Sequence, residues 1–250
     1  MLNLIDGDLI AYRSAASAEP TKAKPFLEPC QAALFRVHDM VQTIIKGTNC
    51  NDMEFYLGGS DNFRKKLYPE YKGNRTKPPP TYLQECRELL VTEYGAKIVN
   101  GRETDDELGI RQTFHDGNSR IVSLDKDLLQ IPGYHYNWVR DTHTLVSPLD
   151  GLRTFYKQLI SGDGTDNIPS YDGKIRNSIP KFIEKLQQPI DEMTEEYEMY
   201  NYVKEVYSNF SDLEFEDEQF VTKELHRNAS LLYILKNEDE HWQIPGTPQE

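Results

Sequence analysis

Short apolar runs recur along the first half of the chain, each followed by a turn or a helical pattern. Four runs predict buried strands: LNLI (residues 2–5), MEFYLGG (53–59), AKIVNG (96–101) and RIVSL (120–124). The intervening segments have helical apolar spacing at residues 31–47, 81–94 and 104–115. This alternation predicts an α/β fold, a three-layer core around a mainly parallel central sheet.

The pattern changes after about residue 150. YHYNWV (134–139) and THTLVSP (142–148) predict a strand pair, and the rest is mostly helical with loops at GDGTDNIPSYDG (162–173) and near Asn209. We therefore expect an α/β core over residues 1–150 and a helical lobe with a tail over 151–250, packed on the core. The last ten residues, HWQIPGTPQE, are expected to fray.

The net charge of −13 is unevenly distributed. Residues 191–218 contain eleven acids and one base, which is typical of a solvated helix face and loop, whereas residues 62–77 contain six bases and one acid. The basic stretch is either solvated surface or a surface that faces a phosphate backbone. The overall acidity therefore does not exclude a nucleic-acid partner.

The three cysteines, the N-terminus and the hydropathy all indicate a cytoplasmic protein. Cys30, Cys50 and Cys86 are an odd number without metal-ligand spacing, as expected for reduced thiols. The first apolar stretch contains acids, unlike a signal peptide, and no apolar run has the length of a membrane span.

Three predicted strands run directly into acidic residues, namely Asp6, Glu103 and Asp125. Because ligands bind at the carboxyl ends of strands in open α/β sheets, we expect these acids to lie at one edge. Further acids follow at three-residue or two-residue spacing, as Asp105 and Asp106, Asp127, and Asp163 and Asp166. So many carboxylates need compensation, and hard divalent cations with oxygen ligands provide it. The six scattered histidines have no ligand pattern.

Taken in order, five segments resemble motifs of the 5′-nuclease superfamily, which includes flap endonucleases, the 5′ nuclease domain of bacterial DNA polymerases and phage 5′–3′ exonucleases. The segments are LIDGD, FRKKLYPEYKGNR, GRETDDELG, SLDKDLLQI and ISGDGTDNIPS. The resemblance covers residues 2–186 and is greatest to the replication exonucleases of bacteriophages.

The resemblance implies two Mg²⁺ or Mn²⁺ ions that activate water and stabilise the leaving group. It places the first ion at Asp6, Glu103, Asp105 and Asp106, and the second at Asp125, Asp127 and Asp166, with Asp163 acting through water. It also implies catalytic cations over the scissile phosphate, Lys72 and Arg75. Other nucleic-acid contacts are expected from basic residues of the two halves: Arg64, Lys65, Lys174, Arg176, Lys181 and Lys185.

The implied activity is 5′–3′ exonuclease cleavage of DNA, and also of RNA in RNA–DNA duplexes and of 5′ flaps, in phage DNA replication or recombination. The expected partners are duplex 5′ ends, nicks or flaps, and replication proteins. We expect a monomer in the host cytoplasm, with no membrane partner.

Three departures from the family pattern stand out. The second-strand Asp is absent from Leu57-Gly58-Gly59-Ser60, so either Asp61 replaces it or the site has one carboxylate fewer. The segment between Arg75 and Glu103 is short and contains Pro78-Pro79-Pro80, which argues against a full threading arch. The hairpin glycines are not kept at residues 170–176, which argues against a monovalent ion site there.

Two other functions remain as alternatives. A haloacid dehalogenase-type phosphatase would use Asp6 as nucleophile and Asp8 as its partner, but this leaves GRETDDELG and YPEYKGNR without a role. A non-catalytic binder of DNA structures with a degraded site would account for the missing second-strand acid.

Overall fold

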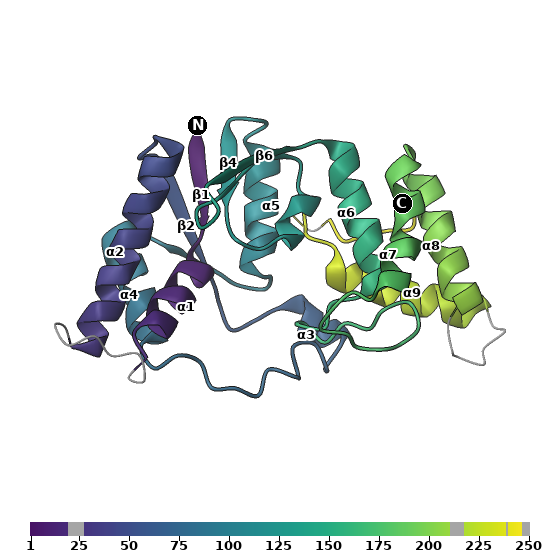
Figure 1. Ribbon diagram of the computed structural model, residues 1–250, viewed down its shortest axis with the longest axis horizontal. Helices are drawn as coiled ribbons and strands as arrows, with labels where there is room; N and C mark the ends of the chain where they lie inside the picture. Colours follow the sequence, from purple (N-terminus) through teal and green to yellow (C-terminus); the bar gives the residue numbers. More distant parts are fainter. Residues whose placement is uncertain (20–27, 211–217, 239, 247–250) are drawn as a thin grey trace. The chain divides into compact units, whose positions relative to one another are not determined.

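The computed structural model describes residues 1–19, 28–210, 218–238 and 240–246 (Figure 1). The chain forms two compact units, which we describe separately. Unit 1 comprises Met1–Asn62, Lys77–Val146 and Lys236–Glu238. Unit 2 comprises Phe63–Thr76, Ser147–Leu235 and Asp239–Glu250. The basic segment 63–76 is therefore grouped with the helical second half, which differs from a simple division near residue 150.

A six-stranded sheet forms the centre of unit 1, in the order β3-β2-β1-β4-β5-β6. All neighbouring strands are parallel except β5 and β6. The strands are β1 (Leu2–Asp6), β2 (Met53–Gly58), β3 (Lys97–Val99), β4 (Ser119–Val122), β5 (Gly133–Asn137) and β6 (Thr142–Val146). The α/β class with a mainly parallel sheet is thus confirmed, as is the final strand pair.

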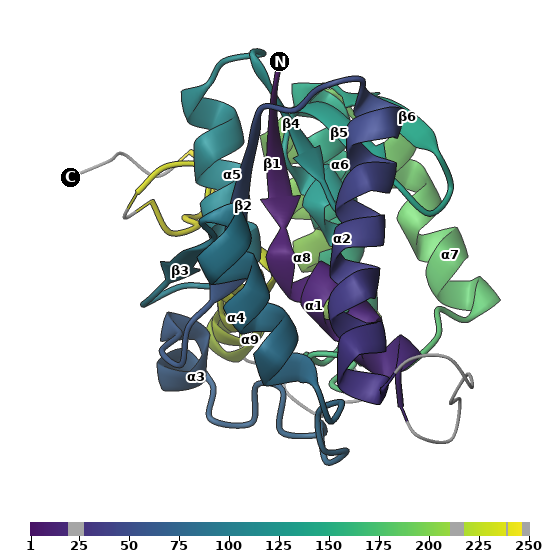
Figure 2. The ribbon, with the colours of Figure 1, turned by 90° about the vertical axis from the view of Figure 1, so that its left-hand side faces the viewer.

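Helices cover both faces of this sheet, and Figure 2 shows α5 on one side of β1 and α2 on the other. The helices of unit 1 are α1 (Gly7–Ser17), α2 (Pro29–Thr48), α4 (Leu83–Tyr94) and α5 (Thr104–Phe114). The aliphatic faces of α1, α2 and α4 pack in one buried cluster with Ile5, Leu57 and Val122 of the sheet. These three layers fix the strand ends on which the candidate site depends.

Helix α1 is an element that the hydrophobic pattern did not predict. Its sequence begins with Asp6-Gly7-Asp8, which is typical of a turn. In the structure Asp6 ends β1 and caps α1, because its side chain accepts the backbone N–H of Leu9 at 3.1 Å. The helix buries Gly7, Ile10, Ala11, Ser14 and Ala15, and this spacing of three and four residues places them on one face.

Unit 2 is helical and has its own apolar core. Its helices are α3 (Phe63–Leu67), α6 (Pro148–Ser161), α7 (Lys181–Gln187), α8 (Glu196–Phe210) and α9 (Glu218–Leu232), with α6 in contact with α7, α8 and α9 (Figure 1). The described residues also include the 3₁₀ segments η2 (Asp127–Gln130) in unit 1 and η3 (Gln188–Glu192) in unit 2.

Two details of this half correct the sequence-based expectations. The basic segment begins with the short helix α3, which the hydrophobic pattern did not predict. The C-terminal tail is not frayed as far as Trp242, which is buried against Phe155 and Tyr200. The tail is mostly polar, but the large apolar surface of the Trp242 indole holds it against unit 2. Part of the acidic stretch, residues 211–217, lies outside the described residues.

Across the part of the chain that the structure describes, every helix is too short or too polar to cross a membrane. The three cysteines are free, and Cys86 is buried, as the sequence predicted for reduced thiols.

Candidate metal centre

The carboxyl ends of β1 and β4 bring two acidic segments together. These strands are parallel neighbours, with Ile5 paired to Val122, so Asp6 and the residues after Val122 lie at the same sheet edge. The Ser123 hydroxyl donates to Asp6 Oδ2 at 2.8 Å and accepts the backbone N–H of Asp125 at 3.0 Å. The predicted convergence of Asp6 and Asp125 therefore has a direct bridge in the structure.

Asp6 is an acid whose charge is poorly compensated within the folded protein. Its side chain is buried, and this burial, followed by the negative charges of Asp8 and Asp125, raises the pKa of Asp6 to about 7. Hydrogen bonds from Leu9 and Ser123 act in the opposite direction but do not prevail. A carboxylate of this kind would be stabilised in its charged form by a cation.

Asp125 and Asp127 form a compact turn after β4. The backbone N–H of Asp127 donates to Asp125 Oδ1 at 2.9 Å, which starts the 3₁₀ helix η2. Asp125 is exposed and Asp127 is half-buried, whereas Leu128 beside them is buried and anchors the turn. The sequence DKDLL thus combines two oxygen-rich side chains with an apolar anchor.

The third acidic segment begins α5. Glu103 is the N-cap, and the fully buried Asp106 accepts the N–H of Glu103 at 3.0 Å in a capping box. Glu103 and Asp105 are half-buried. The following acid, Glu107, has a different role: burial favours a higher pKa, but hydrogen bonds from Arg102 and Arg111 hold the pKa below its usual value.

The remaining two predicted ligands, Asp163 and Asp166, occupy a tight turn of unit 2. The backbone of Asp163 pairs with Ile168 in both directions, and Asp163 Oδ1 accepts the N–H of Thr165 at 2.7 Å. The sequence predicted a loop over residues 162–173, and the structure has a turn at these two acids. Whether these acids join those of unit 1 stays a prediction.

Asp166 is held by the basic motif of the same unit. Its carboxylate accepts the Tyr71 hydroxyl at 2.8 Å and forms ion pairs with Arg75 and, at 3.4 Å, with Lys72. The two cations that the sequence predicted over a phosphate therefore neutralise a predicted metal ligand. Tyr71 is an interaction partner that sequence reasoning missed, although it lies within the YPEYKGNR motif.

Backbone contacts fix the same two motifs to each other. The N–H of Lys72 donates to the Asp166 carbonyl at 2.9 Å, and the Asn74 side chain donates to the Gly164 carbonyl at 2.6 Å. Lys72 and Asn167 both have left-handed backbones, with φ of 58° and 61°. Lysine rarely adopts this conformation, so the turn geometry is imposed by its surroundings.

Two of the predicted nucleic-acid contacts face inward. Arg64 is 2% exposed and donates to the carbonyls of Leu231 and Tyr233 at 2.8 and 2.7 Å. Arg176 is paired with the buried Asp172, and this pair lowers the pKa of Asp172 to about 2 although burial favours a higher pKa. Both guanidinium groups are therefore engaged by acceptors of the protein itself.

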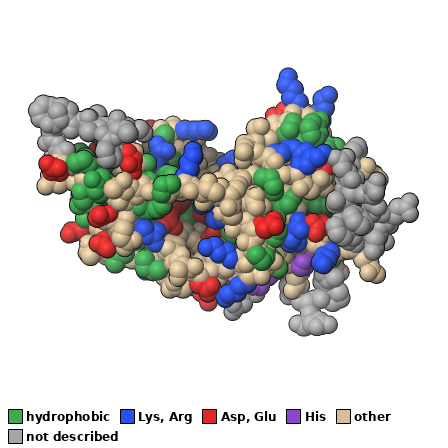
Figure 3. All heavy atoms as spheres, turned by 90° about the horizontal axis from the view of Figure 1, so that it is seen from below, with side chains coloured by type: hydrophobic (Ala, Val, Ile, Leu, Met, Phe, Trp, Pro, Cys, Tyr) green, Lys and Arg blue, Asp and Glu red, His purple; other side chains and the backbone are tan. Residues whose placement is uncertain are grey.

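The other predicted contacts, Lys65, Lys174, Lys181 and Lys185, are exposed. Lys174 also lies 3.6 Å from Asp172. On the surface drawn in Figure 3, Lys and Arg side chains form several small groups with Asp and Glu among them. DNA contacts therefore have to be assigned residue by residue.

The described side chains do not form a closed cage for an ion. Among them, no three His, Cys, Asp or Glu side chains are gathered closely enough to hold a metal. Hydrogen bonds and ion pairs within the protein engage Asp6, Asp106 and Asp166 instead. The donor set still fits a hard divalent cation, because it is made of carboxylate oxygens and includes an acid whose pKa is raised.

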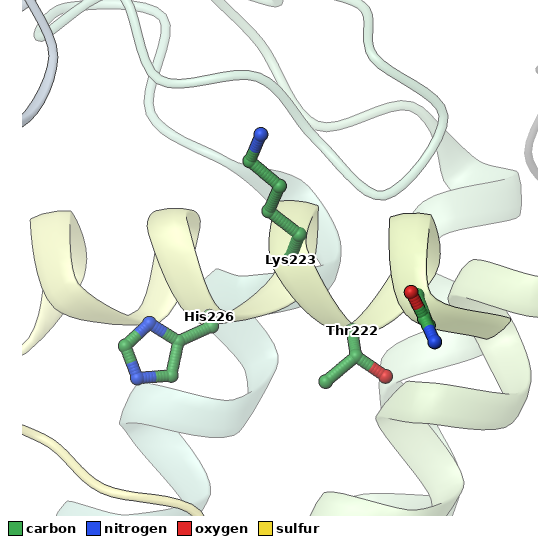
Figure 4. A pocket seen from close by; sticks show the side chains of 4 residues that line it. Thr222, Lys223 and His226 are labelled. Atoms are coloured by element: carbon green, nitrogen blue, oxygen red, sulfur yellow. The ribbon is translucent and has the colours of Figure 1, made fainter.

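A hollow of about 500 Å³ lies elsewhere, on α9 of unit 2 (Figure 4). Its described lining consists of Gln219, Thr222, Lys223 and His226. These residues include no acid, so this hollow does not compete with the strand ends as a divalent-metal site.

Comparison with known proteins identifies a family for this chain. Residues 1–152 match the family described as 5′-3′ exonuclease, N-terminal resolvase-like domain. A 5′-3′ exonuclease of Buchnera aphidicola subsp. Acyrthosiphon pisum is 29% identical over 187 residues, which cover 66% of this chain and 64% of that protein. One of Buchnera aphidicola subsp. Schizaphis graminum is 25% identical over 185 residues, covering 66% and 63%. The chain thus spans slightly less than two thirds of these relatives.

Among solved structures, the T5 D15 protein co-crystallised with metal ions is similar, with a TM-score of 0.62 and 18% identity over 92% of this chain and 88% of that one. At this identity the likeness shows the fold. The family match covers more than half of the chain, and it confirms the resemblance to the 5′-nuclease superfamily. The chain therefore belongs to the 5′-3′ exonuclease family, whose N-terminal resolvase-like domain it contains.

Proposed function

We propose that this protein is a divalent-metal-dependent 5′–3′ exonuclease that hydrolyses phosphodiesters of DNA. The observation that carries the proposal is the pair of adjacent parallel strands, β1 and β4, whose ends place Asp6 beside the segment of Asp125. The raised pKa of Asp6 supports a cation at this edge. Family membership supports the reaction class.

We assign the carboxylates to two ions, Mg²⁺ or Mn²⁺. The first would be held by the acids of β1 and α5: Asp6, Glu103, Asp105 and Asp106. The second would be held by the turn after β4 and the turn of unit 2: Asp125, Asp127 and Asp166, with Asp163 through water. Two such ions, when bound, activate water and stabilise the leaving oxygen of an in-line displacement.

Lys72 and Arg75 are proposed to contact the scissile phosphate. Both side chains form ion pairs with Asp166 in this structure. A metal ion bound at Asp166 would take over the neutralisation of its charge, and Lys72 and Arg75 could then pair with a phosphate instead. Arg75 is 52% exposed at its side chain, so reaching a phosphate requires little desolvation. Lys65, Lys174 and Lys181 are proposed to contact the DNA backbone farther from the cleaved bond.

The substrate range proposed here includes 5′ ends, nicks and flaps of duplex DNA, and RNA in RNA–DNA duplexes. We place the activity in phage DNA replication or recombination. Asp61, which is exposed, stays open as a substitute for the missing second-strand acid. The phosphatase alternative is disfavoured, because Asp8 would have to act as a free acid but is paired with Arg87.

An end-label assay tests the proposal. Duplexes that carry a label at the 5′ or at the 3′ end are incubated with Mg²⁺ or with EDTA. We expect release of short products from the 5′ label in Mg²⁺ only, and flapped, nicked and RNA–DNA duplexes then give the substrate order.

Two variants complete the assay. Asp125→Asn is expected to lose the activity, whereas the matched control Asp52→Asn, an exposed acid before the amino end of β2, is expected to keep it. Cleavage in EDTA, or DNA binding without turnover in Mg²⁺ and Mn²⁺, would overturn the proposal in favour of other chemistry or a non-catalytic binder.

A further inference from the structure

Asp8 connects three segments of unit 1 that carry or adjoin the proposed metal ligands. It lies in the first turn of α1, two residues after Asp6. Its Oδ2 accepts the N–H of Gly58, at the end of β2, at 2.7 Å, and the hydroxyl of Thr104, at the start of α5, also at 2.7 Å. Thr104 stands between Glu103 and Asp105 in the sequence.

Arg87 completes this network from α4. Its guanidinium forms an ion pair with Asp8 Oδ1 and also donates to the Gly58 carbonyl. Both oxygens of the Asp8 carboxylate therefore accept hydrogen bonds, and one arginine fork ties that carboxylate to the β2 backbone. Charge-assisted hydrogen bonds of this kind are stronger than neutral ones and fix orientation.

The network also occupies the space beside Gly58. A Cβ atom at this position would lie 3.1 Å from Asp8 Oδ2 and 3.3 Å from Thr104 Oγ1, closer than most real Cβ contacts. A carboxylate side chain on residue 58 would therefore have to displace Asp8 or Thr104. The position of the Asp8 carboxylate therefore requires glycine, or a very small side chain, at the end of β2.

We propose that Asp8 is a positioning residue, which with Arg87 fixes the acid-bearing first turn of α5 relative to Asp6 and takes the place that a β2 carboxylate would occupy. This inference rests on the proposed metal-dependent function. We assign Asp8 the role of an outer partner that accepts from Gly58, Thr104 and Arg87, and the number of ions bound by Asp8→Asn distinguishes this role from that of a ligand. Loss of such an outer partner typically lowers metal affinity about 10–100-fold while leaving the ligands in place.

Binding of Mn²⁺, followed by the electron paramagnetic resonance of the free ion, tests this inference in the full chain without a turnover assay. We expect the wild-type protein to bind two ions. Thr104→Val, which deletes the hydroxyl and keeps the shape, and Asp8→Asn should still bind two, with half-saturation of one ion shifted upward about tenfold or more. Thr104→Ser, which keeps the hydroxyl, should bind like the wild type.

The matched control is Thr48→Val. The Thr48 hydroxyl is also buried in unit 1, where it accepts from Asn3 at 3.1 Å and donates to the Ile44 carbonyl at 2.7 Å. It lies near the amino end of β1, away from the acids, so this variant should lose stability without a change in Mn²⁺ half-saturation. The melting temperature of each variant is measured alongside.

Three results would overturn the inference. If Asp8→Asn binds one ion instead of two, Asp8 is a ligand. If Thr104→Val and Asp8→Asn melt earlier but bind both ions like the wild type, the network is merely structural. If the wild-type protein binds no Mn²⁺, the metal centre of the proposed function fails, and the positioning role fails with it.

Discussion

Replacing Asp6 with asparagine is expected to stabilise the metal-free protein at neutral pH. Asparagine has nearly the same shape, and its side-chain oxygen can still accept the N–H of Leu9 that caps α1. The substitution removes the charge, whose burial next to Asp8 and Asp125 raises the pKa of Asp6 from 3.8 to about 7. It also replaces Oδ2, which accepts the Ser123 hydroxyl, with an amide donor. A raised pKa means that the folded state favours the neutral acid over the carboxylate.

The magnitude follows from linkage. A rise of about three pKa units at about 1.4 kcal/mol each makes the charged Asp6 cost about 4 kcal/mol of folding stability above pH 7. This cost is absent below the unfolded pKa, grows as the pH rises and is complete above the folded pKa. The lost hydrogen bond from Ser123 offsets about 1 kcal/mol of this gain. The free energy of unfolding of Asp6→Asn should therefore be higher than that of the wild type by about 3 kcal/mol at pH 8 and by about 2 kcal/mol at pH 6.

Urea unfolding in EDTA at the two pH values measures this difference. Trp138 is buried in unit 1 and Trp242 in unit 2, so a Trp242→Phe background makes tryptophan fluorescence report on the unit that contains Asp6. Added Mg²⁺ should stabilise the wild type and have little effect on Asp6→Asn. A lower stability of Asp6→Asn than of the wild type at pH 8, or a difference in stability that falls from pH 6 to pH 8, would show that the buried charge of Asp6 is not the cause.

Two further predictions concern the basic segment of unit 2. Asp166→Asn removes the acid that Lys72 and Arg75 neutralise, so metal-free binding of duplex DNA should tighten, and its logarithmic salt dependence should steepen by about 2 if both cations gain a phosphate. Fluorescence anisotropy in EDTA from 50 to 200 mM KCl measures this, and an unchanged slope contradicts it. Arg64→Met should lower the free energy of unfolding by about 3 kcal/mol in urea titrations, because a buried and a partly buried carbonyl lose a charged donor. Lys65→Met, its exposed neighbour, should leave stability unchanged and weaken DNA binding, and equal destabilisation by both variants would contradict the assigned roles.

Much of unit 1 could be predicted from the sequence because its strands are short apolar runs bounded by acids or glycines. The parallel direction of the strands follows from their alternation with helices. Because the carboxyl ends of parallel strands lie at one edge of the sheet, Asp6 and Asp125 are brought together. Helix α1 was missed because Asp6-Gly7-Asp8 has the composition of a turn. The same aspartate that favours a turn is also a favourable N-cap.

Side-chain partners far apart in the sequence were beyond pattern reasoning. Asp8 and Arg87 are separated by 79 residues, and only the packing of α1 on α4 brings them into contact. Arg64 looked like a phosphate contact because it stands in a basic segment, but α3 turns it toward backbone carbonyls. Charge in a sequence says which residues can bind an anion, whereas tertiary structure decides which of them face solvent.

Anomalous diffraction from crystals grown with Mn²⁺ is the sharpest test of the proposed two-ion centre, since it locates the ions relative to named carboxylates. We expect two peaks. One should lie within ligand distance of Asp6 and the acids that begin α5, and the other within ligand distance of Asp125, Asp127 and Asp166, at about 2.0–2.2 Å from their oxygens. Peaks that avoid these carboxylates, or none at all from protein that cleaves DNA, would contradict the assignment of this sheet edge as the metal centre.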